Sequence, residues 1–286
     1  MQSIEKRAQN NGGQDNGRLR RLRGSTTVEL PNGSIHINTG SKVGQVLLEN
    51  ILSLPADLKI RGEENLTTLR TVLDCNKRQP DQAVGVWGTL IHTGHLDFPK
   101  VVEAIVKAGG EDFRERIFLA MGNRVDGTLG VGFASRFYPF TRTPQPYDAE
   151  ADGNLSAEEL AVRMAEDQAL LRESRRAMDY FFKQGRVGLI APTGSRKKTE
   201  VIPQVVGYFK GKLIMPIHID GSAQILAPGR FLPSRRGTLT ISFGEIYPFS
   251  DIEGATRGIS SREEQRRAQA TMVMDRINAL APQRKL

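Results

Sequence analysis

The sequence predicts an α/β fold: a mixed, largely parallel sheet with helices on both faces. Short apolar runs typical of strands alternate with longer segments in which apolar residues recur at helical spacing. The run "AVGVWGTLI" (residues 83–91) is continuously apolar, as expected of a strand that is covered on both faces. In such folds the functional groups usually lie on the loops that follow strand ends.

The chain begins with segments outside this alternation. Residues 1–24 are polar, rich in Asn, Gly and Arg, and without periodicity, which predicts a disordered basic tail. The stretch "TTVELPNGSIHIN" (26–38) predicts a hairpin around Asn32-Gly33. With a short helix expected over 41–54, it makes an N-terminal segment over 25–57, and residues 58–286 are expected to form the α/β domain.

The elements of this domain follow in order. Strands are predicted over 83–91, 116–122, 186–192, 212–219 and 238–246. A helix is predicted over 98–110, and a long helix should begin at the capping box Ser156/Glu159 and end near Gln184-Gly185, after an acidic, proline-rich loop over 143–154. A last helix should run from about Ser261 to Leu280. The long helix is expected to supply core residues: Met164, Leu170, Leu171, Met178, Phe181 and Phe182.

Composition excludes several classes of protein. No run of 18 apolar residues is present, and the N-terminus lacks the apolar core of a secretory signal. The single cysteine, Cys75, excludes an internal disulfide framework and fits a reducing compartment, so a cytoplasmic location is expected. Six basic and two acidic residues in the tail account for +4 of the net charge of +8, which weakens a nucleic-acid function for the body of the chain.

The stretch "LIAPTGSRKKTE" (189–200) resembles a nucleotide-binding P-loop. A P-loop needs glycine directly before its lysine, so that backbone N–H groups can wrap the phosphates, but Arg196 stands there. Thr199 is also one residue too far along, and no acidic strand end for magnesium follows. A glycine turn followed by Arg196, Lys197 and Lys198 instead predicts an anion-binding loop; the alternative is a solvated basic loop.

His92 and Asp97 lie in "HTGHLDFP", directly after the strand predicted over 83–91. A glycine turn can bring the carboxylate against the imidazole, fixing its tautomer and leaving the second ring nitrogen free as a base. Alternatively, Asp97 only caps the helix and His92 is incidental. A metal site of His92, His95 and Asp97 lacks a second ligand cluster in the sequence. The remaining histidines, His36 and His218, lie in predicted strands and are expected to be structural.

These motifs together resemble the glycerolipid acyltransferases, that is, the glycerol-3-phosphate and 1-acylglycerol-3-phosphate acyltransferases. The resemblance covers roughly residues 58–250 and follows the order of the family's blocks: "IRGEENL" (60–66), "HTGHLD" as H-x4-D, "MGNRV" with "GFASRFYPFTR" (121–142), "IAPTGSR" (190–196), "IMPIHI" (214–219) and "FGEIYPF" (243–249). The chain departs from the family pattern at Asn123 and Thr193, which leaves open a non-catalytic lipid- or phosphate-binding member of the fold.

The resemblance implies transfer of a fatty acyl group from a thioester to a hydroxyl, with His92 as general base and Asp97 as the residue that orients it. Candidates for binding the acceptor phosphate are Arg124, Arg136, Gly194, Ser195, Arg196 and Lys197. No metal or cofactor is implied, and Cys75 is taken as incidental. The implied donor is acyl-CoA or acyl carrier protein, and the acceptor is glycerol 3-phosphate or, alternatively, lysophosphatidic acid or another hydroxyl lipid. The basic tail allows peripheral contact with the anionic inner face of a membrane, and no nucleic-acid partner is expected.

Overall fold

The computed structural model describes residues 25–30, 33–38, 56–91, 97–122, 138–144, 155–193, 203–225 and 237–282. The tail over 1–24 and the helix predicted over 41–54 lie outside these residues. The strands are β1 (Ser25–Leu30), β2 (Gly33–Asn38), β3 (Ala56–Arg61), β4 (Val86–Leu90), β5 (Ile117–Gly122), β6 (Phe140–Thr143), β7 (Val187–Ile190), β8 (Leu213–Asp220), β9 (Gly237–Phe243) and β10 (Tyr247–Pro248). Described helices are α3 (Glu64–Arg78), α4 (Asp97–Gly109), α7 (Ala157–Lys183), α8 (Ser222–Ile225), α9 (Phe249–Ala255) and α10 (Arg262–Asn278), with short 3₁₀ turns at η2 (Pro80–Gln82), η3 (Glu111–Arg116) and η5 (Pro203–Tyr208).

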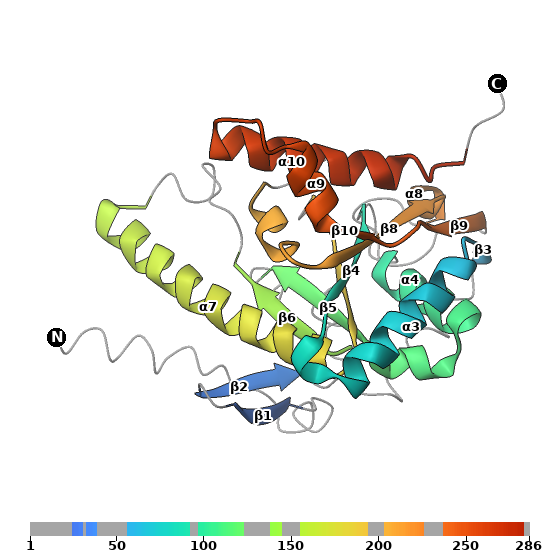
Figure 1. Ribbon diagram of the computed structural model, residues 1–286, viewed down its shortest axis with the longest axis horizontal. Coiled ribbons are helices and arrows are strands. Elements are labelled where there is room, and N and C mark those ends of the chain that lie inside the picture. Colours follow the sequence, from blue (N-terminus) through green and yellow to red (C-terminus); the bar gives the residue numbers. More distant parts are fainter. Residues whose placement is uncertain are drawn as a thin grey trace.

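The described strands form one mixed sheet, in the order β1-β2-β6-β5-β7-β4-β8-β9-β3, with β10 paired to β8 (Figure 1). Its central strands β6, β5, β7, β4 and β8 are parallel. Strands β2, β9 and β10 pair antiparallel with their neighbours in this block. The sequence-based prediction of a mixed, largely parallel α/β sheet is therefore confirmed.

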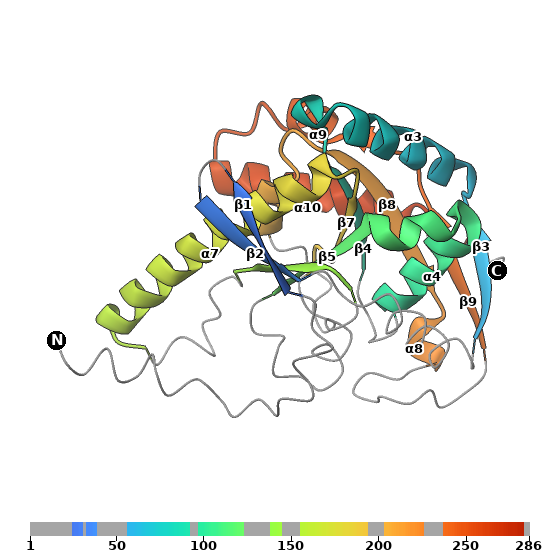
Figure 2. The same cartoon turned by 90° about the horizontal axis from the view of Figure 1, so that it is seen from below.

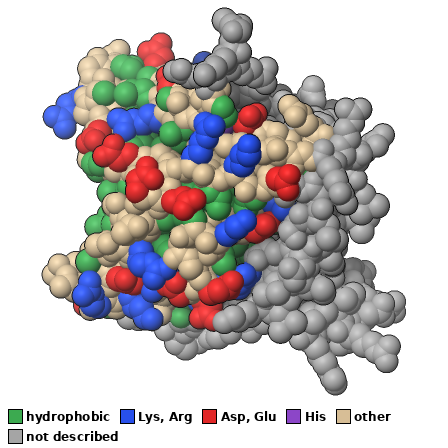
Figure 3. All heavy atoms as spheres, turned by 90° about the vertical axis from the view of Figure 1, so that its right-hand side faces the viewer, with side chains coloured by type: hydrophobic (Ala, Val, Ile, Leu, Met, Phe, Trp, Pro, Cys, Tyr) green, Lys and Arg blue, Asp and Glu red, His purple; other side chains and the backbone are tan. Residues whose placement is uncertain are grey.

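Helices cover both faces of the sheet, because apolar residues project alternately to either side of its buried strands. Helices α3 and α4 bury Leu69 and Ile105 against one face, where Val86 of β4 and Leu189 of β7 also lie. Helices α7, α9 and α10 cover the other face, over a second core that contains Trp87 of β4. Over the described part of the side shown in Figure 3, positive and negative side chains are interspersed.

Most predicted elements are present within the described residues. The hairpin is confirmed: β1 and β2 pair from Ser25↔Asn38 to Leu30↔Gly33, and Asn38 continues the sheet by pairing with Phe140 of β6. The capping box is also confirmed, since the Ser156 hydroxyl accepts from the backbone N–H of Glu159, whose carboxylate accepts from the backbone N–H of Ser156. Helices α3, α8 and α9, strand β6 and the 3₁₀ turns η2, η3 and η5 were not predicted from the sequence.

The first half of α7 corrects one expectation about the core. The Ser174 hydroxyl donates a hydrogen bond to the backbone carbonyl of Arg142, near the end of β6, and so marks where α7 passes the edge of the sheet. Residues 157–173 precede this point and extend for about 25 Å at 1.5 Å per residue, and Figures 1 and 2 show the helix projecting away from the sheet. Met164, predicted to be a core residue, is consequently 56% exposed, whereas Met178 and Phe181 are buried as expected.

Candidate functional site

The carboxyl ends of the parallel strands β5, β7, β4 and β8 meet at one edge of the sheet. Thr89, near the end of β4, pairs with Ile190 at the end of β7 and with Pro216 of β8. Strand β5 lies on the far side of β7 and is parallel to it. The segments that follow these strands therefore leave the sheet from the same edge, which is where ligand sites of open α/β sheets are found.

A topological switch point lies between β4 and β7 at this edge. After β4 the chain crosses through α4 to β5, on one side of β4, and after β7 it crosses through η5 to β8, on the other side. The first connection packs on the α3 and α4 face of the sheet, and the second packs on the opposite face. Neighbouring strands whose connections leave to opposite faces mark the usual position of the binding crevice in such sheets. The two segments that begin here are those with the H-x4-D motif and with the predicted anion-binding loop.

Of the site residues predicted from the sequence, the structure describes Asp97. Outside the described residues lie His92, Arg124, Arg136, Gly194, Ser195, Arg196 and Lys197. In the chain, His92 follows β4, Arg124 follows β5 and Gly194 follows β7, so three neighbouring parallel strands lead into these segments. Arg136 instead precedes the amino end of β6, so the strand order supplies no such argument for it.

Asp97 is the first residue of α4, and its side chain is fully buried. Backbone N–H groups at a helix start have no partner within the helix and carry a partial positive charge, so they stabilise a carboxylate there. Helix α4 is held in place by Val101, Val102 and Ile105, which are buried in the core against the sheet. The carboxylate is therefore fixed, seven residues after the last residue of β4, at the edge where the candidate site is expected.

Helix α4 also carries a buried cation, Lys100, three residues after Asp97. Lys100 is completely buried, and its ammonium donates to the carboxylate of Glu103 at 2.8 Å. The Glu103 side chain is 22% exposed, so water reaches the anionic member of this ion pair but hardly the cationic one. Desolvating an ammonium is costly unless it is paired, so the contact with Glu103 offsets part of the cost of burying Lys100.

Buried hydroxyl groups mark the same edge. Thr89 of β4 and Thr193, three residues after β7, are fully buried, and neither hydroxyl oxygen has a hydrogen-bond partner among the described residues. Buried polar atoms are nearly always paired in folded proteins, so exceptions call for a functional or structural explanation. Two exceptions on adjacent strand ends fit a site at which a ligand supplies the missing hydrogen bonds.

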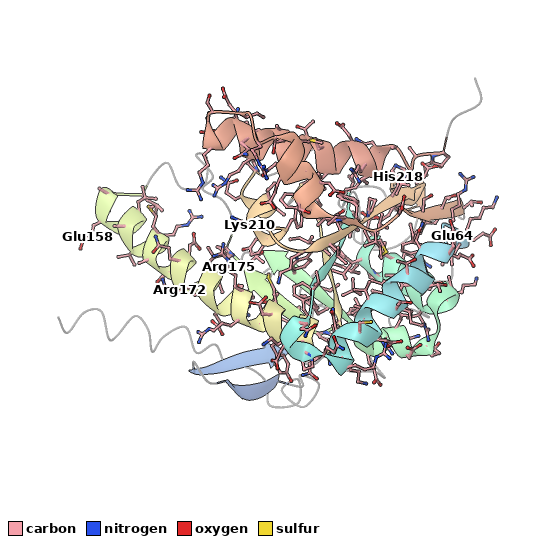
Figure 4. All side chains as sticks on the ribbon, in the orientation of Figure 1. Glu64, Glu158, Arg172, Arg175, Lys210 and His218 are labelled. Atoms are coloured by element: carbon pink, nitrogen blue, oxygen red, sulfur yellow. The ribbon has the colours of Figure 1, made fainter. Side chains whose placement is uncertain are left out.

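A second pair of such atoms lies on the neighbouring strands β8 and β9. His218 and Ser242 are register partners, and in the described part of the chain neither His218 Nδ1 nor Ser242 Oγ has a hydrogen-bond partner. Figure 4 shows His218 on β8, near the carboxyl-terminal end of α10. Burial lowers the pKa of the His218 imidazole, and the charge of Asp220 opposes this shift. The ring is therefore neutral near pH 7.

The sequence analysis missed Thr89, Ser242 and Lys100 as candidate site residues. For Thr89 a signal was present, because a hydroxyl interrupts an otherwise apolar strand that is buried on both faces. The thiol of Cys75 is exposed on α3, away from the strand ends discussed here.

Five chains of solved structures are similar to this protein, among them the one described next. The crystal structure of the 1-acyl-sn-glycerophosphate (LPA) acyltransferase PlsC from Thermotoga maritima aligns with a TM-score of 0.42 and 16% sequence identity, over 84% of this chain and 81% of that one. No protein-family model and no curated protein matches the sequence. None of the helices that the structure describes is both long and apolar enough to cross a membrane.

Proposed function

We propose that this protein is an acyltransferase that moves a fatty acyl group from an acyl thioester to the hydroxyl of glycerol 3-phosphate or a related phospholipid precursor. One observation carries the proposal: the H-x4-D segment and the glycine–arginine segment follow adjacent parallel strands at a topological switch point. The order of motifs resembles that of the glycerolipid acyltransferases, and the buried Asp97 at the start of α4 supports it.

In the proposed reaction His92 acts as the general base. Its imidazole removes the proton of the acceptor hydroxyl while the oxygen attacks the thioester carbonyl carbon. The carbon–sulfur bond then breaks, the ester forms, and the imidazolium returns the proton to the departing thiolate. Asp97 orients the ring and stabilises its charged form, a task that suits a carboxylate held rigidly in a helix start.

The acceptor phosphate would be bound by the segments after β5 and β7. Arg124 and Arg196 are suited to this because a guanidinium can contact phosphate oxygens in a bidentate manner. Gly194 would let the backbone approach the phosphate closely, with Ser195 and Lys197 as further donors. Arg136 is a weaker candidate, because it precedes β6 and does not follow one of the parallel strands at this edge. Binding the phosphate at a distance from the reacting hydroxyl positions that hydroxyl, and this accounts for much of the rate gain in such reactions.

A direct product analysis tests the proposal. The purified full-length protein is incubated with acyl-CoA or acyl carrier protein donors and with glycerol 3-phosphate or lysophosphatidic acid, and the products are identified by mass spectrometry. We expect a new ester with the wild-type protein and at least about a 10²-fold slower reaction with Asp97→Asn. An Asp97→Asn variant as active as the wild type would contradict the mechanism.

The same experiment separates the alternatives that the sequence leaves open. If lysophosphatidic acid is esterified and glycerol 3-phosphate is not, the acceptor is lysophosphatidic acid or a related hydroxyl lipid. Binding of either acceptor without any ester product would favour a non-catalytic member of the fold, which the departures at Asn123 and Thr193 allow.

A further inference from the structure

Three polar side chains on neighbouring strands at the carboxyl edge have no role in the reaction described above. Thr89 of β4, His218 of β8 and Ser242 of β9 each carry a buried oxygen or nitrogen atom that has no hydrogen-bond partner among the described residues. Strand β8 lies between β4 and β9, so the three residues come from adjacent positions in the sheet.

All three side chains project from the same face of the sheet. Leu90 of β4, Ile217 of β8 and Phe243 of β9 are buried in the core beneath α3 and α4. Since side chains alternate along a strand, the residues directly before Leu90 and Phe243 and directly after Ile217 project to the opposite face. Those residues are Thr89, Ser242 and His218.

Register fixes how close the three positions are. His218 and Ser242 are direct partners of an antiparallel pair, whose Cβ atoms lie about 4.5–5.5 Å apart. Thr89 pairs with Pro216, two residues before His218, which makes it a diagonal neighbour at about 7–8 Å. The carboxyl-terminal end of α10 lies beside them, because a Cβ built on Gly244 would be 2.6 Å from Pro216 Cγ and 3.0 Å from Leu280 Cδ1.

The chemistry of this cluster favours a neutral ligand. Burial keeps the imidazole of His218 uncharged near pH 7, and the carboxylate of Asp220 is close enough to affect it. A phosphate would meet this carboxylate without a cationic partner among the three residues. An uncharged amide or hydroxyl group, in contrast, can donate to His218 Nδ1 or accept from the hydroxyl of Ser242 or Thr89.

The position of the cluster within the sheet indicates which substrate carries that group. In the proposed function the acceptor phosphate is bound by segments after β5 and β7, and the base follows β4. The cluster lies on the β8 and β9 side of β4, opposite to the acceptor. The base contacts the acceptor hydroxyl, and the acceptor phosphate takes up the β5 and β7 side, so the β8 and β9 side of β4 is left for the acyl donor.

We propose that Thr89, His218 and Ser242 form a subsite for the amide-bearing pantetheine arm of the acyl donor. This arm is common to acyl-CoA and acyl carrier protein, and its amides and hydroxyl are uncharged. The inference rests on the proposed acyltransferase function for its substrate. Its position rests on the three buried atoms that have no hydrogen-bond partner in the described part of the chain.

Steady-state kinetics with Ser242→Ala and His218→Leu test the subsite. The donors are octanoyl-CoA, octanoyl-pantetheine, octanoyl carrier protein and the octanoyl thioester of mercaptoethanol, which has no amide. For the three donors that carry the arm, KM should be about 3- to 10-fold higher in each variant than in the wild type, which is the change expected when one hydrogen bond is lost. KM for the acceptor and KM for the amide-free donor should stay within about 2-fold of the wild-type values.

Stability measurements separate a binding role from a structural one. Ser242→Ala removes a buried hydroxyl that has no hydrogen-bond partner among the residues that the structure describes. The unliganded variant should therefore melt at the same temperature as the wild type or higher. Thr238→Ala, at an exposed position of the same strand, is the matched control and should change neither KM nor melting. Unchanged KM values for octanoyl-pantetheine in both variants would overturn the subsite, as would an equal rise for the amide-free donor. An effect confined to octanoyl-CoA would overturn it too, because the arm is shared.

Direct binding keeps this test independent of catalysis. If the wild-type protein transfers no acyl group, calorimetry with CoA and with pantetheine replaces kinetics. Binding to the wild type that is 3- to 10-fold weaker in Ser242→Ala supports the subsite although the proposed reaction has failed. Absence of binding to the wild type, or equal binding to the variant, overturns the subsite.

Discussion

Trp87 of β4 and Gly188 of β7 are partners in the parallel pairing of the two strands between which the switch point lies. A Cβ atom on Gly188 would be 2.4 Å from Cζ3 of Trp87 and 2.7 Å from Cζ of Phe118. The indole ring thus fills the space that a side chain on β7 would need. It is anchored by Phe118 and Phe182 in edge-to-face contact and by a hydrogen bond from its Nε1 to the carbonyl of Tyr208 at 2.9 Å.

Gly188→Ala is therefore expected to destabilise the protein by about 1–3 kcal/mol, the usual cost of overpacking a core. Urea denaturation measures the loss, and emission from Trp87 reports unfolding because this is the only tryptophan. Gly254→Ala on α9 is the control. Apart from its own helix backbone and chain neighbours, no described atom lies within 4 Å of the added Cβ, so the free energy of unfolding should stay the same or rise slightly. Equal effects of the two substitutions would show that the close contact at Gly188 does not limit packing.

The ion pair on α4 predicts unequal costs for its two partners. Glu103→Gln leaves the fully buried ammonium of Lys100 without a carboxylate and should cost about 3 kcal/mol or more. Lys100→Met leaves Glu103, which is partly hydrated, and removes the buried charge, so a smaller loss of unfolding free energy is expected. Urea denaturation of both variants at pH 7 checks the order, and a larger loss for Lys100→Met would contradict the burial argument.

His218 predicts a pH dependence of stability. Its pKa in the folded protein is lowered, chiefly by burial, from about 6.5 in an unfolded chain. Between these two values the unfolded state binds more protons, so the free energy of unfolding falls as the pH decreases through this window. The variant His218→Gln lacks this imidazole and shares all other titrating groups with the wild type. Its free energy of unfolding should therefore fall less than that of the wild type between pH 7.5 and pH 5.5. Parallel losses in urea denaturation would show that the imidazole is not desolvated.

The proposed phosphate contacts predict a selective kinetic effect. Arg196→Ala should raise KM for glycerol 3-phosphate about 10-fold or more, because a charge-assisted contact to the phosphate is lost, while KM for the acyl donor stays unchanged. Arg142→Ala is a suitable control, since this arginine is exposed on β6. An unchanged acceptor KM in the Arg196 variant would remove that residue from the site.

The sequence predicted much of the fold because local signals agree with the tertiary structure at many elements. The apolar runs over β4, β5 and β7 are buried on both faces, and the Ser156/Glu159 box begins α7 where expected. Helix α3 was missed even though Leu66, Leu69 and Leu73 have helical spacing. Its N-cap is Glu63, which is not one of the favoured N-cap residue types, so the sequence carries no start signal there.

Other features depend on tertiary structure and could not be predicted from local sequence. The exposure of Met164 follows from the length of α7 relative to the sheet, which periodicity does not reveal. Strand order, which brings the segments after β4, β5 and β7 to one edge, follows from crossover connections. The pairing of His218 with Ser242 also requires the register of β8 and β9. The spacing of His92 and Asp97, together with the order of motifs, suggested Asp97 from the sequence, and the structure adds its burial at the start of α4.

The central claim is that His92 is the base of an acyl transfer, and a comparison of two neighbouring histidines tests it most directly. Initial rates of ester formation are measured with the wild-type protein, His92→Ala and His95→Ala under the same conditions. The account predicts a loss of at least about 10³-fold in kcat/KM for His92→Ala and less than about 10-fold for His95→Ala. Acyl transfer by His92→Ala at the wild-type rate would contradict it.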